Sequence, residues 1–254
     1  MPEQIIDGEV LYYAVHADPG ARRSLILIHG AGESHLVWPR ALRNLRGAIV
    51  YALDLPGHGR SRGRGRSSIA EYAEVIVRWM EAVGIPEAVW VGHSMGGAIA
   101  QWAALHHPER VAGLVLIATG ARLRVSPQIL EGLRSNFPQT VDLITEWSWG
   151  TAPPAQLVEE GRRMLLAMDP TVVEGDYRAC DAFDVMGQLE AIRVPTLVIG
   201  GTADRMTPMK YAEYLAAHIP GAQLVRIEGA GHMVMLEQPE AVAEAVRSFL
   251  DRLT

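Results

Sequence analysis

Two short segments near the N-terminus alternate between apolar and polar residues. They lie at 4–7 and 9–16 and meet at Asp7-Gly8. An Asp-Gly pair between two alternating segments is a strong hairpin signal, because both residues accept the positive φ angles of a tight two-residue turn. The pattern therefore predicts an antiparallel β-hairpin over these residues.

After this hairpin the apolar residues come in short continuous runs, as in strands buried on both faces of a parallel sheet. The runs lie at 24–28, 48–52, 88–91, 113–117 and 196–199, and a sixth at 222–227 carries polar residues as an edge strand would. Helical patterns fall between them at 68–83, 95–106, 209–218 and 239–253. Ser68 and Glu71 open the first helix with the spacing of a capping box. This alternation predicts an α/β fold with a mostly parallel, doubly wound sheet.

The segment 121–188 interrupts the alternation. It contains helical patterns but no strand run, at 129–133, 141–147, 155–167 and 174–189. A helical insertion between two late strands predicts a cap over the carboxyl ends of the strands, where open α/β sheets bind ligands. We therefore expect three parts, which are a first part of the core at 1–120, a helical cap at 121–188 and a second part of the core at 189–254.

A possible nucleophile lies between the strand run at 88–91 and the helix that follows it. Gly92-His93-Ser94-Met95-Gly96 has the form G-x-S-x-G in this strand-turn-helix context. The two glycines permit a turn so sharp that the hydroxyl of Ser94 is raised above the sheet. The helix then points its positive N-terminal end at the negative charge that develops in the reaction. The pattern predicts a nucleophilic serine, and the alternative is a glycine-rich turn with an idle hydroxyl.

A serine hydroxyl needs a base to accept its proton and an acid to orient that base. Of the nine histidines, His232 lies in a glycine-rich turn after the last strand run. This turn is expected at the same edge of the sheet as Ser94. Asp204 follows the preceding strand run and reaches the same edge. Asp54 is the alternative acid, but turn formers follow it, and an aspartate there more simply bonds its own backbone. We therefore predict Asp204 as the acid and His232 as the base.

Acyl transfer also needs backbone amides aimed at the oxyanion. Met95 supplies one amide from the turn, and Ala31 in His29-Gly-Ala-Gly supplies the second after the strand run at 24–28. His29 is expected to brace this loop. A flexible glycine loop is the alternative interpretation, whereas a dinucleotide site is not expected because no G-x-G-x-x-G follows a strand run.

Methionines flank the predicted catalytic loops and recur in the predicted cap, which suits an adaptable apolar pocket. Plain core filling is the alternative for about half of them. We expect the substrate pocket to include Trp38, Trp147, Met206 and Met233.

Composition narrows the possible partners. The 254 residues carry a net charge of −6, which argues against nucleic acid or an anionic membrane as the main partner. The single cysteine, Cys180, permits no internal disulfide and has no activating neighbour in the sequence, so it is expected to be a packing residue. The first ten residues lack the pattern of a secretory signal, and no window reaches the ~20 apolar residues of a membrane span. These observations favour a soluble, cytoplasmic protein.

These residues together resemble the α/β-hydrolase family across essentially the whole chain. The residues that show this resemblance are His29-Gly30, Asp54-Leu-Pro-Gly-His-Gly-Arg-Ser61, the turn around Ser94, Asp204 and Gly231-His232. The chain order Ser94, Asp204, His232 is the order of triads in this family. The serine at 94 differs from the aspartate of haloalkane dehalogenases and epoxide hydrolases. Met233 stands where meta-cleavage C–C hydrolases typically show Trp, and Ala31 where cofactor-free haloperoxidases usually place an aromatic residue.

The resemblance is therefore to the carboxylesterase and enol-lactonase branch. It implies a serine carboxylic-ester hydrolase that acts on small to medium, largely apolar esters through an acyl-enzyme. Its partners would be the ester and water, without a metal ion or organic cofactor. The alternatives are a C–C bond hydrolase or lactonase of aromatic degradation, and a ligand receptor that retains the triad.

Overall fold

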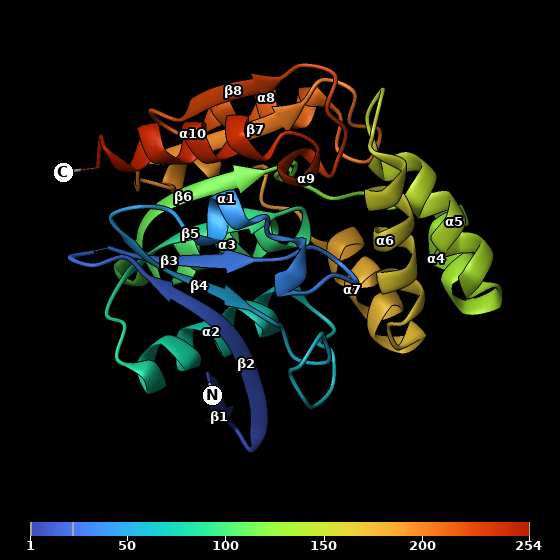
Figure 1. Cartoon of the computed structure of the whole chain (residues 1–254), viewed down its shortest axis with the longest axis horizontal. Helices are drawn as coiled ribbons and strands as arrows, with labels where there is room; N and C mark the ends of the chain where they lie inside the picture. Colours follow the sequence, from blue (N-terminus) through green and yellow to red (C-terminus); the bar gives the residue numbers. More distant parts are fainter. Residues whose placement is uncertain (1, 22, 254) are drawn as a thin grey trace.

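The computed structural model describes residues 2–21 and 23–253. A twisted eight-stranded sheet runs through the molecule in the order β1-β2-β4-β3-β5-β6-β7-β8 (Figure 1). Its strands are β1 (Glu3–Ile6), β2 (Glu9–Ala17), β3 (Arg23–Ile28), β4 (Ala48–Leu53), β5 (Ala88–His93), β6 (Val111–Ile117), β7 (Thr196–Gly201) and β8 (Gln223–Ile227). From β4 to β8 neighbouring strands are parallel, whereas β1 pairs with β2 and β2 pairs with β4 in antiparallel fashion.

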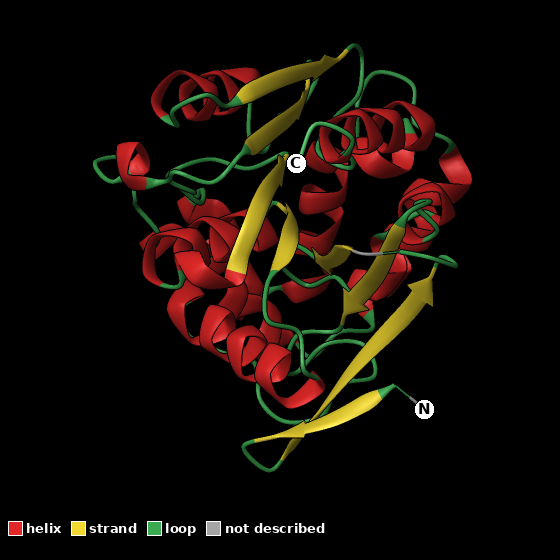
Figure 2. Cartoon of the chain, turned by 90° about the vertical axis from the view of Figure 1, so that its left-hand side faces the viewer, coloured by secondary structure: helices red, strands yellow, loops and turns green. Residues whose placement is uncertain are grey.

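The predicted hairpin forms one end of this sheet (Figure 2). Asp7 has φ 51° and Gly8 has φ 83°, the left-handed conformation that the Asp-Gly pair predicts. At the opposite end, β8 keeps polar and partly exposed residues, as expected for an edge strand. Every residue of the central strands β5 and β7 is buried, which explains their continuous apolar runs.

Helices cover both faces of the sheet. On β3, Ile26 and Ile28 face one core together with α2 (Ile69–Val83), α3 (Met95–His106) and α8 (Met209–His218). Leu25 and Leu27 face the other core with α1 (Arg40–Arg43) and α10 (Pro239–Leu250). Successive strand residues point to opposite faces, so two helical layers form on one sheet. The shorter elements are η1 (His35–Val37), η2 (Pro108–Arg110), η3 (Leu189–Ala191) and α9 (Val234–Glu237).

The predicted capping box at the start of α2 is present. The Ser68 hydroxyl accepts a hydrogen bond from the Glu71 amide at 3.2 Å. The Glu71 carboxylate reaches back to the hydroxyl of Ser68 and to the amide of Ser67. The first contact satisfies one of the amide groups that the first turn of a helix leaves without partners, and the others hold the residues just before the helix.

Four helices are inserted between β6 and β7, beside the ends to which the parallel strands point (Figure 1). They are α4 (Pro127–Ser135), α5 (Phe137–Ser148), α6 (Ala155–Leu166) and α7 (Pro170–Ala182), and we call them the helical insertion. α4, α5 and α7 share a small apolar core, whereas α6 has no buried residue.

The expectation of a helix at 174–189 was wrong in its bounds. α7 begins at Pro170, because the Asp169 side chain caps its first turn at 2.8 Å from the Thr171 amide. It ends at Ala182, because the chain then becomes extended and Asp184 forms a bridge with Arg122.

No helix among residues 2–21 and 23–253 is long and apolar enough to cross a membrane.

Candidate active site

The turn between β5 and α3 holds Ser94 in a strained conformation, with φ 51° and ψ −116°. The flanking glycines are required by close backbone contacts. A Cβ atom on Gly92 would lie 2.2 Å from the Gly96 oxygen, and one on Gly96 would lie 2.0 Å from the Ile28 oxygen. Strain of this kind is kept where the surrounding structure enforces it, and it is common at functional sites. Here it lifts Ser94 to the end of the sheet, as the motif predicts.

His232 and Asp204 meet at the same end of the sheet, although 28 residues separate them. The Nδ1 atom of His232 donates a hydrogen bond to Oδ2 of Asp204 at 2.9 Å. The Thr207 hydroxyl donates to the same oxygen at 2.8 Å, and the amides of Met206 and Thr207 donate to Oδ1. Asp204 is therefore a fully bonded, buried carboxylate that fixes the ring of His232 through Nδ1.

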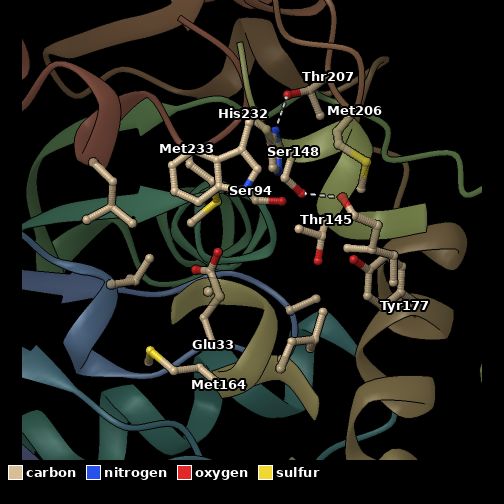
Figure 3. A pocket seen from close by; sticks show the side chains of 18 of the residues that line it. Glu33, Ser94, Thr145, Ser148, Met164, Tyr177, Met206, Thr207, His232 and Met233 are labelled. Carbon is tan, nitrogen blue, oxygen red and sulfur yellow. Dashed lines mark hydrogen bonds between the residues drawn. The ribbon is translucent and has the colours of Figure 1, made fainter. Parts of the chain in front are cut away.

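The surroundings of Asp204 keep it ionised. Burial alone would raise the pKa of this carboxyl, but the His232 ring and the hydrogen bonds from Thr207 together hold that pKa below its usual value. An ionised carboxylate can only accept hydrogen bonds, so Nδ1 of His232 carries a proton, and in the neutral ring Nε2 then has a free lone pair. Ser94 and His232 both line one cavity (Figure 3).

The His232 loop is held by the helical insertion. Glu237 accepts hydrogen bonds from the amides of Gly231, at 2.9 Å, and of Gly150, at 3.0 Å. The Met233 amide donates to the Ser148 oxygen at 3.0 Å. The two loops approach so closely that a Cβ atom on Gly231 would lie 2.3 Å from the Gly150 nitrogen. The end of α5 is therefore a fixed wall beside His232.

The loop after β3 places Ala31 at the cavity between two amides held by carboxylates. The Gly30 amide donates to Glu33 at 2.6 Å, and the Gly32 amide donates to Asp176 at 2.9 Å. Among residues 2–21 and 23–253, the amides of Ala31 and Met95 donate no hydrogen bond to another residue. Two free amides beside a candidate nucleophile are what an oxyanion hole requires.

His29 braces this loop. Its Nδ1 donates to the Gly30 oxygen at 2.8 Å, and its Nε2 accepts from the Leu55 amide at 3.0 Å. Burial lowers the pKa of His29 to about 4, so the ring is neutral at pH 7. A neutral ring with one donor and one acceptor fits both contacts.

A cavity of about 230 Å³ lies between the insertion and the loops that carry Ala31, Ser94 and His232. Its walls are mostly apolar, and the insertion contributes Ile144, Ser148, Trp149, Leu157, Met164, Leu165, Tyr177 and Cys180 among others. Leu36 and Met164 line it and are the large apolar side chains most exposed to solvent here, at 58% and 38%. The cavity thus combines an apolar wall with the candidate catalytic groups at one end.

Two of the four residues expected in the substrate pocket line the cavity and two do not. Met206 and Met233 line the cavity, but Trp38 and Trp147 do not. Trp38 follows η1 and is wholly buried in the core on the α10 side of the sheet. Trp147 packs against the core of the insertion, and the Arg205 guanidinium lies 5.7 Å from the centre of its ring. Trp149, two residues further on and in extended conformation, takes the place at the cavity instead.

The other residues considered from the sequence have structural contacts. Asp54 accepts hydrogen bonds from the amides of His35, at 2.7 Å, and Arg60, at 2.8 Å, so it holds loops together and does not contact His232. Cys180 is buried, and burial raises the pKa of its thiol well above the usual range. In the described part of the chain, no three His, Cys, Asp or Glu side chains are grouped to hold a metal ion.

Sequence reasoning missed Glu33. This residue follows the glycine loop directly, and its carboxylate lines the cavity (Figure 3). An acidic residue next to a predicted oxyanion loop is a signal that the sequence contains, but its orientation depends on His93 and Gly30, which the sequence does not place.

Comparison with known proteins agrees with this geometry. Residues 23–239 match the family model described as the alpha/beta hydrolase fold. The chain is 29% identical over 243 residues to a pimeloyl-acyl-carrier-protein methyl ester esterase of Serratia marcescens, which covers 90% of this chain and 94% of that protein. It is 36% identical over 247 residues to a polyketide synthase of Burkholderia thailandensis, but these span 89% of this chain and only 12% of that much longer protein.

Solved structures show the same similarity. A thermophilic esterase superposes with a TM-score of 0.87 at 38% identity, covering 99% of this chain and 97% of the other. An enol-lactonase from Burkholderia xenovorans LB400 superposes with a TM-score of 0.88 at 25% identity, covering 99% of this chain and all of the other.

Proposed function

Because the chain belongs to the α/β-hydrolase family and has esterase relatives, we propose that it is a serine carboxylic-ester hydrolase. In this proposal Ser94 is the nucleophile, His232 the base and Asp204 the orienting acid. The observation that carries it is the bond from His232 Nδ1 to Asp204 Oδ2 at 2.9 Å, with His232 and the strained Ser94 lining one cavity.

The reaction would proceed in two halves. Ser94 Oγ attacks the acyl carbon while Nε2 of His232 takes the hydroxyl proton, and the amides of Ala31 and Met95 stabilise the oxyanion. The tetrahedral intermediate then expels the alcohol, which receives the proton from His232. Water, deprotonated by His232, attacks the acyl-enzyme, and collapse of the second intermediate returns the proton to Ser94 and releases the acid.

The cavity supports small to medium, largely apolar esters as substrates. Its walls are mostly apolar and its volume is about 230 Å³. We propose that the helical insertion acts as a cap that covers the acyl group, because α5, α6 and α7 each contribute to these walls. Lactones are a second candidate substrate class, because the chain resembles an enol-lactonase along its whole length and lactone opening uses the same acyl transfer.

Replacement of Ser94 by alanine tests the proposal. We expect kcat for p-nitrophenyl esters to fall by about 10⁵-fold or more, with the fold intact by circular dichroism. A fluorophosphonate should label the parent enzyme at Ser94 and should not label the variant. Ser135→Ala, on an exposed position at the end of α4, is the matched control and should behave as the parent.

A panel of p-nitrophenyl esters of increasing acyl length, together with simple lactones, would define the substrate class. Multiple turnovers on these substrates separate the esterase from a ligand receptor, which would stop after one turnover. Full activity of Ser94→Ala would overturn the serine mechanism.

A further inference from the structure

The partly buried Glu33 and the fully buried His93 form a pair that the proposed reaction does not use. The Oε2 atom of Glu33 accepts a hydrogen bond from the Gly30 amide at 2.6 Å and another from Nδ1 of His93 at 3.0 Å. Nε2 of His93 lies 3.0 Å from the backbone oxygen of His232. His93 is completely buried and directly precedes Ser94. One chain of contacts thus joins the Ala31 loop, the Ser94 turn and the His232 loop.

The partners of His93 determine its charge. Both of its ring nitrogens face acceptors, a carboxylate oxygen and a backbone oxygen, whereas a neutral imidazole has only one N–H group. The contacts are satisfied together when His93 is an imidazolium and Glu33 is a carboxylate. In this state the pair has no net charge, which allows its carboxylate to line a mostly apolar cavity.

The neighbouring charges favour this state. Burial alone would lower the pKa of His93, but the Glu33 charge, aided by Asp204, holds that pKa above its usual value. Burial alone would raise the pKa of Glu33, but His93 and the Gly30 amide hold it below its usual value. The other titratable groups that face the pair are His29 behind the loop, Tyr177 from α7 and the ring of His232, whose centre lies 4.8 Å from that of His93.

We propose that Glu33 and His93 are positioning residues that set the distance between the oxyanion loop and the base loop. Glu33 fixes the Gly30 end of the loop so that the Ala31 amide stays free and points to the cavity. His93 links that carboxylate to the main chain of His232. The inference rests on the proposed function, because only an acyl-transfer reaction needs the Ala31 amide and His232 in register.

The position of Glu33 predicts a specific kinetic effect. The Ala31 amide is needed when negative charge develops on the substrate oxygen, so a displaced loop affects the transition state more than substrate binding. A displacement of about 1 Å at such a site costs up to about 10²-fold in rate. Loss of the His93 proton at high pH would remove one of the contacts that link the two loops. The pH profile of kcat would then fall on its alkaline side.

Glu33→Gln tests the proposal, because it keeps the shape and an acceptor for Gly30 but removes the charge that holds the His93 proton. We expect kcat to fall about 10- to 100-fold with KM changed less than about threefold. The alkaline limb of kcat should move to lower pH, since the imidazolium loses its counter-charge. Glu131→Gln, on the exposed face of α4, is the matched control and should keep the parent profile.

A second measurement does not depend on the Glu33 variant. Proton NMR of the parent enzyme at pH 7 should show two slowly exchanging ring N–H resonances from His93, both of which disappear in His93→Asn. One resonance would contradict the imidazolium and overturn the pair. A parent-like kcat and pH profile in Glu33→Gln would also overturn the proposal, as would a raised KM at constant kcat, which would make Glu33 a substrate-binding group.

These outcomes are distinct from failure of the proposed function. If Ser94→Ala kept full activity, the serine mechanism would be wrong whatever Glu33 does. If Ser94→Ala is inactive, and fluorophosphonate still labels Ser94 in Glu33→Gln at the parent rate and with the parent pH profile, the serine mechanism stands and the positioning role is wrong.

Discussion

Two of the buried histidine–aspartate pairs in this molecule look alike but are connected differently. At the end of the sheet, His232 bonds Asp204 at 2.9 Å through Nδ1 and lines the cavity. Between the core and α7, His58 bonds Asp176 at 2.7 Å through Nε2, and its Nδ1 lies 3.0 Å from the Pro56 oxygen. His58 does not line the cavity.

The difference lies in the second ring nitrogen. In the proposed reaction this nitrogen of His232 takes the proton of Ser94 and later returns it. In His58 both nitrogens face acceptors, so the ring holds its proton and forms an ion pair. Asp176 also accepts hydrogen bonds from the Tyr72 hydroxyl, at 2.6 Å, and from the Gly32 amide, at 2.9 Å. The same residue pair therefore serves the proposed catalysis in one place and the docking of α7 in the other.

Among the variants of the two pairs, Asp204→Asn is expected to have the largest effect, which is a loss of kcat. The asparagine amide would donate to Nδ1 of His232 and favour the tautomer whose Nε2 carries the proton, so the ring could no longer act as a base for Ser94. We expect kcat to fall about 10³- to 10⁴-fold at pH 7, measured with a p-nitrophenyl ester. Asp251→Asn, at the exposed end of α10, should keep parent activity, and a loss below tenfold in Asp204→Asn would remove Asp204 from the triad.

Asp176→Ala should affect stability most, although it also frees the Gly32 amide beside Ala31 and should lower kcat less than Asp204→Asn does. It leaves the imidazolium of His58 buried without its counter-charge and also removes the acceptor of Tyr72 and Gly32. Removing one partner of a buried ion pair costs about 3–5 kcal/mol in the free energy of unfolding. Urea denaturation should therefore show a lower midpoint, whereas Asp251→Ala should leave the curve unchanged.

The comparison would fail if Asp176→Ala retained parent stability and lost activity as completely as Asp204→Asn. Asp176 would then belong to the reaction and not to the docking of α7.

The two pairs also show what the sequence could and could not predict. Ser94, Asp204 and His232 each follow a strand of the parallel sheet, so strand runs alone predict that they gather at one edge. Asp176 lies 118 residues from His58, in the insertion. No strand order relates those two, and their contact depends on how α7 packs.

The hydrophobic pattern of the sequence also could not predict the direction in which individual side chains point. Trp38 and Trp147 lie in segments near the cavity, but each points into a core because large apolar side chains fill whatever space the packed elements leave. Trp149 lines the cavity because α5 ends one residue before it. Glu33 likewise acquires its role only through His93 and Gly30, whose positions come from the folded loops.

The smallest expected effect is the pH dependence of stability, in which the Asp176 pair acts opposite to the buried His29. Burial alone would lower the pKa of His58, but Asp176 raises it above its usual value. Between the unfolded pKa of about 6.5 and the folded pKa, the folded state binds more protons than the unfolded state, so stability falls as pH rises. The contribution of the pair is complete below about pH 6.5 and is lost as pH rises through the folded pKa.

His29 acts in the opposite direction. Burial lowers its pKa to about 4, so between about pH 6.5 and pH 4 the unfolded chain takes up a proton that the folded chain does not. Stability should therefore also fall as pH decreases through this range. Thermal unfolding from pH 4 to pH 10 should show Tm decreasing on both sides. Asp176→Ala should reduce the alkaline decrease, to which His93 also contributes, and should leave the acid side unchanged. A Tm that rises above pH 7 in the parent, or an alkaline decrease unchanged in Asp176→Ala, would show that His58 is not held protonated by Asp176.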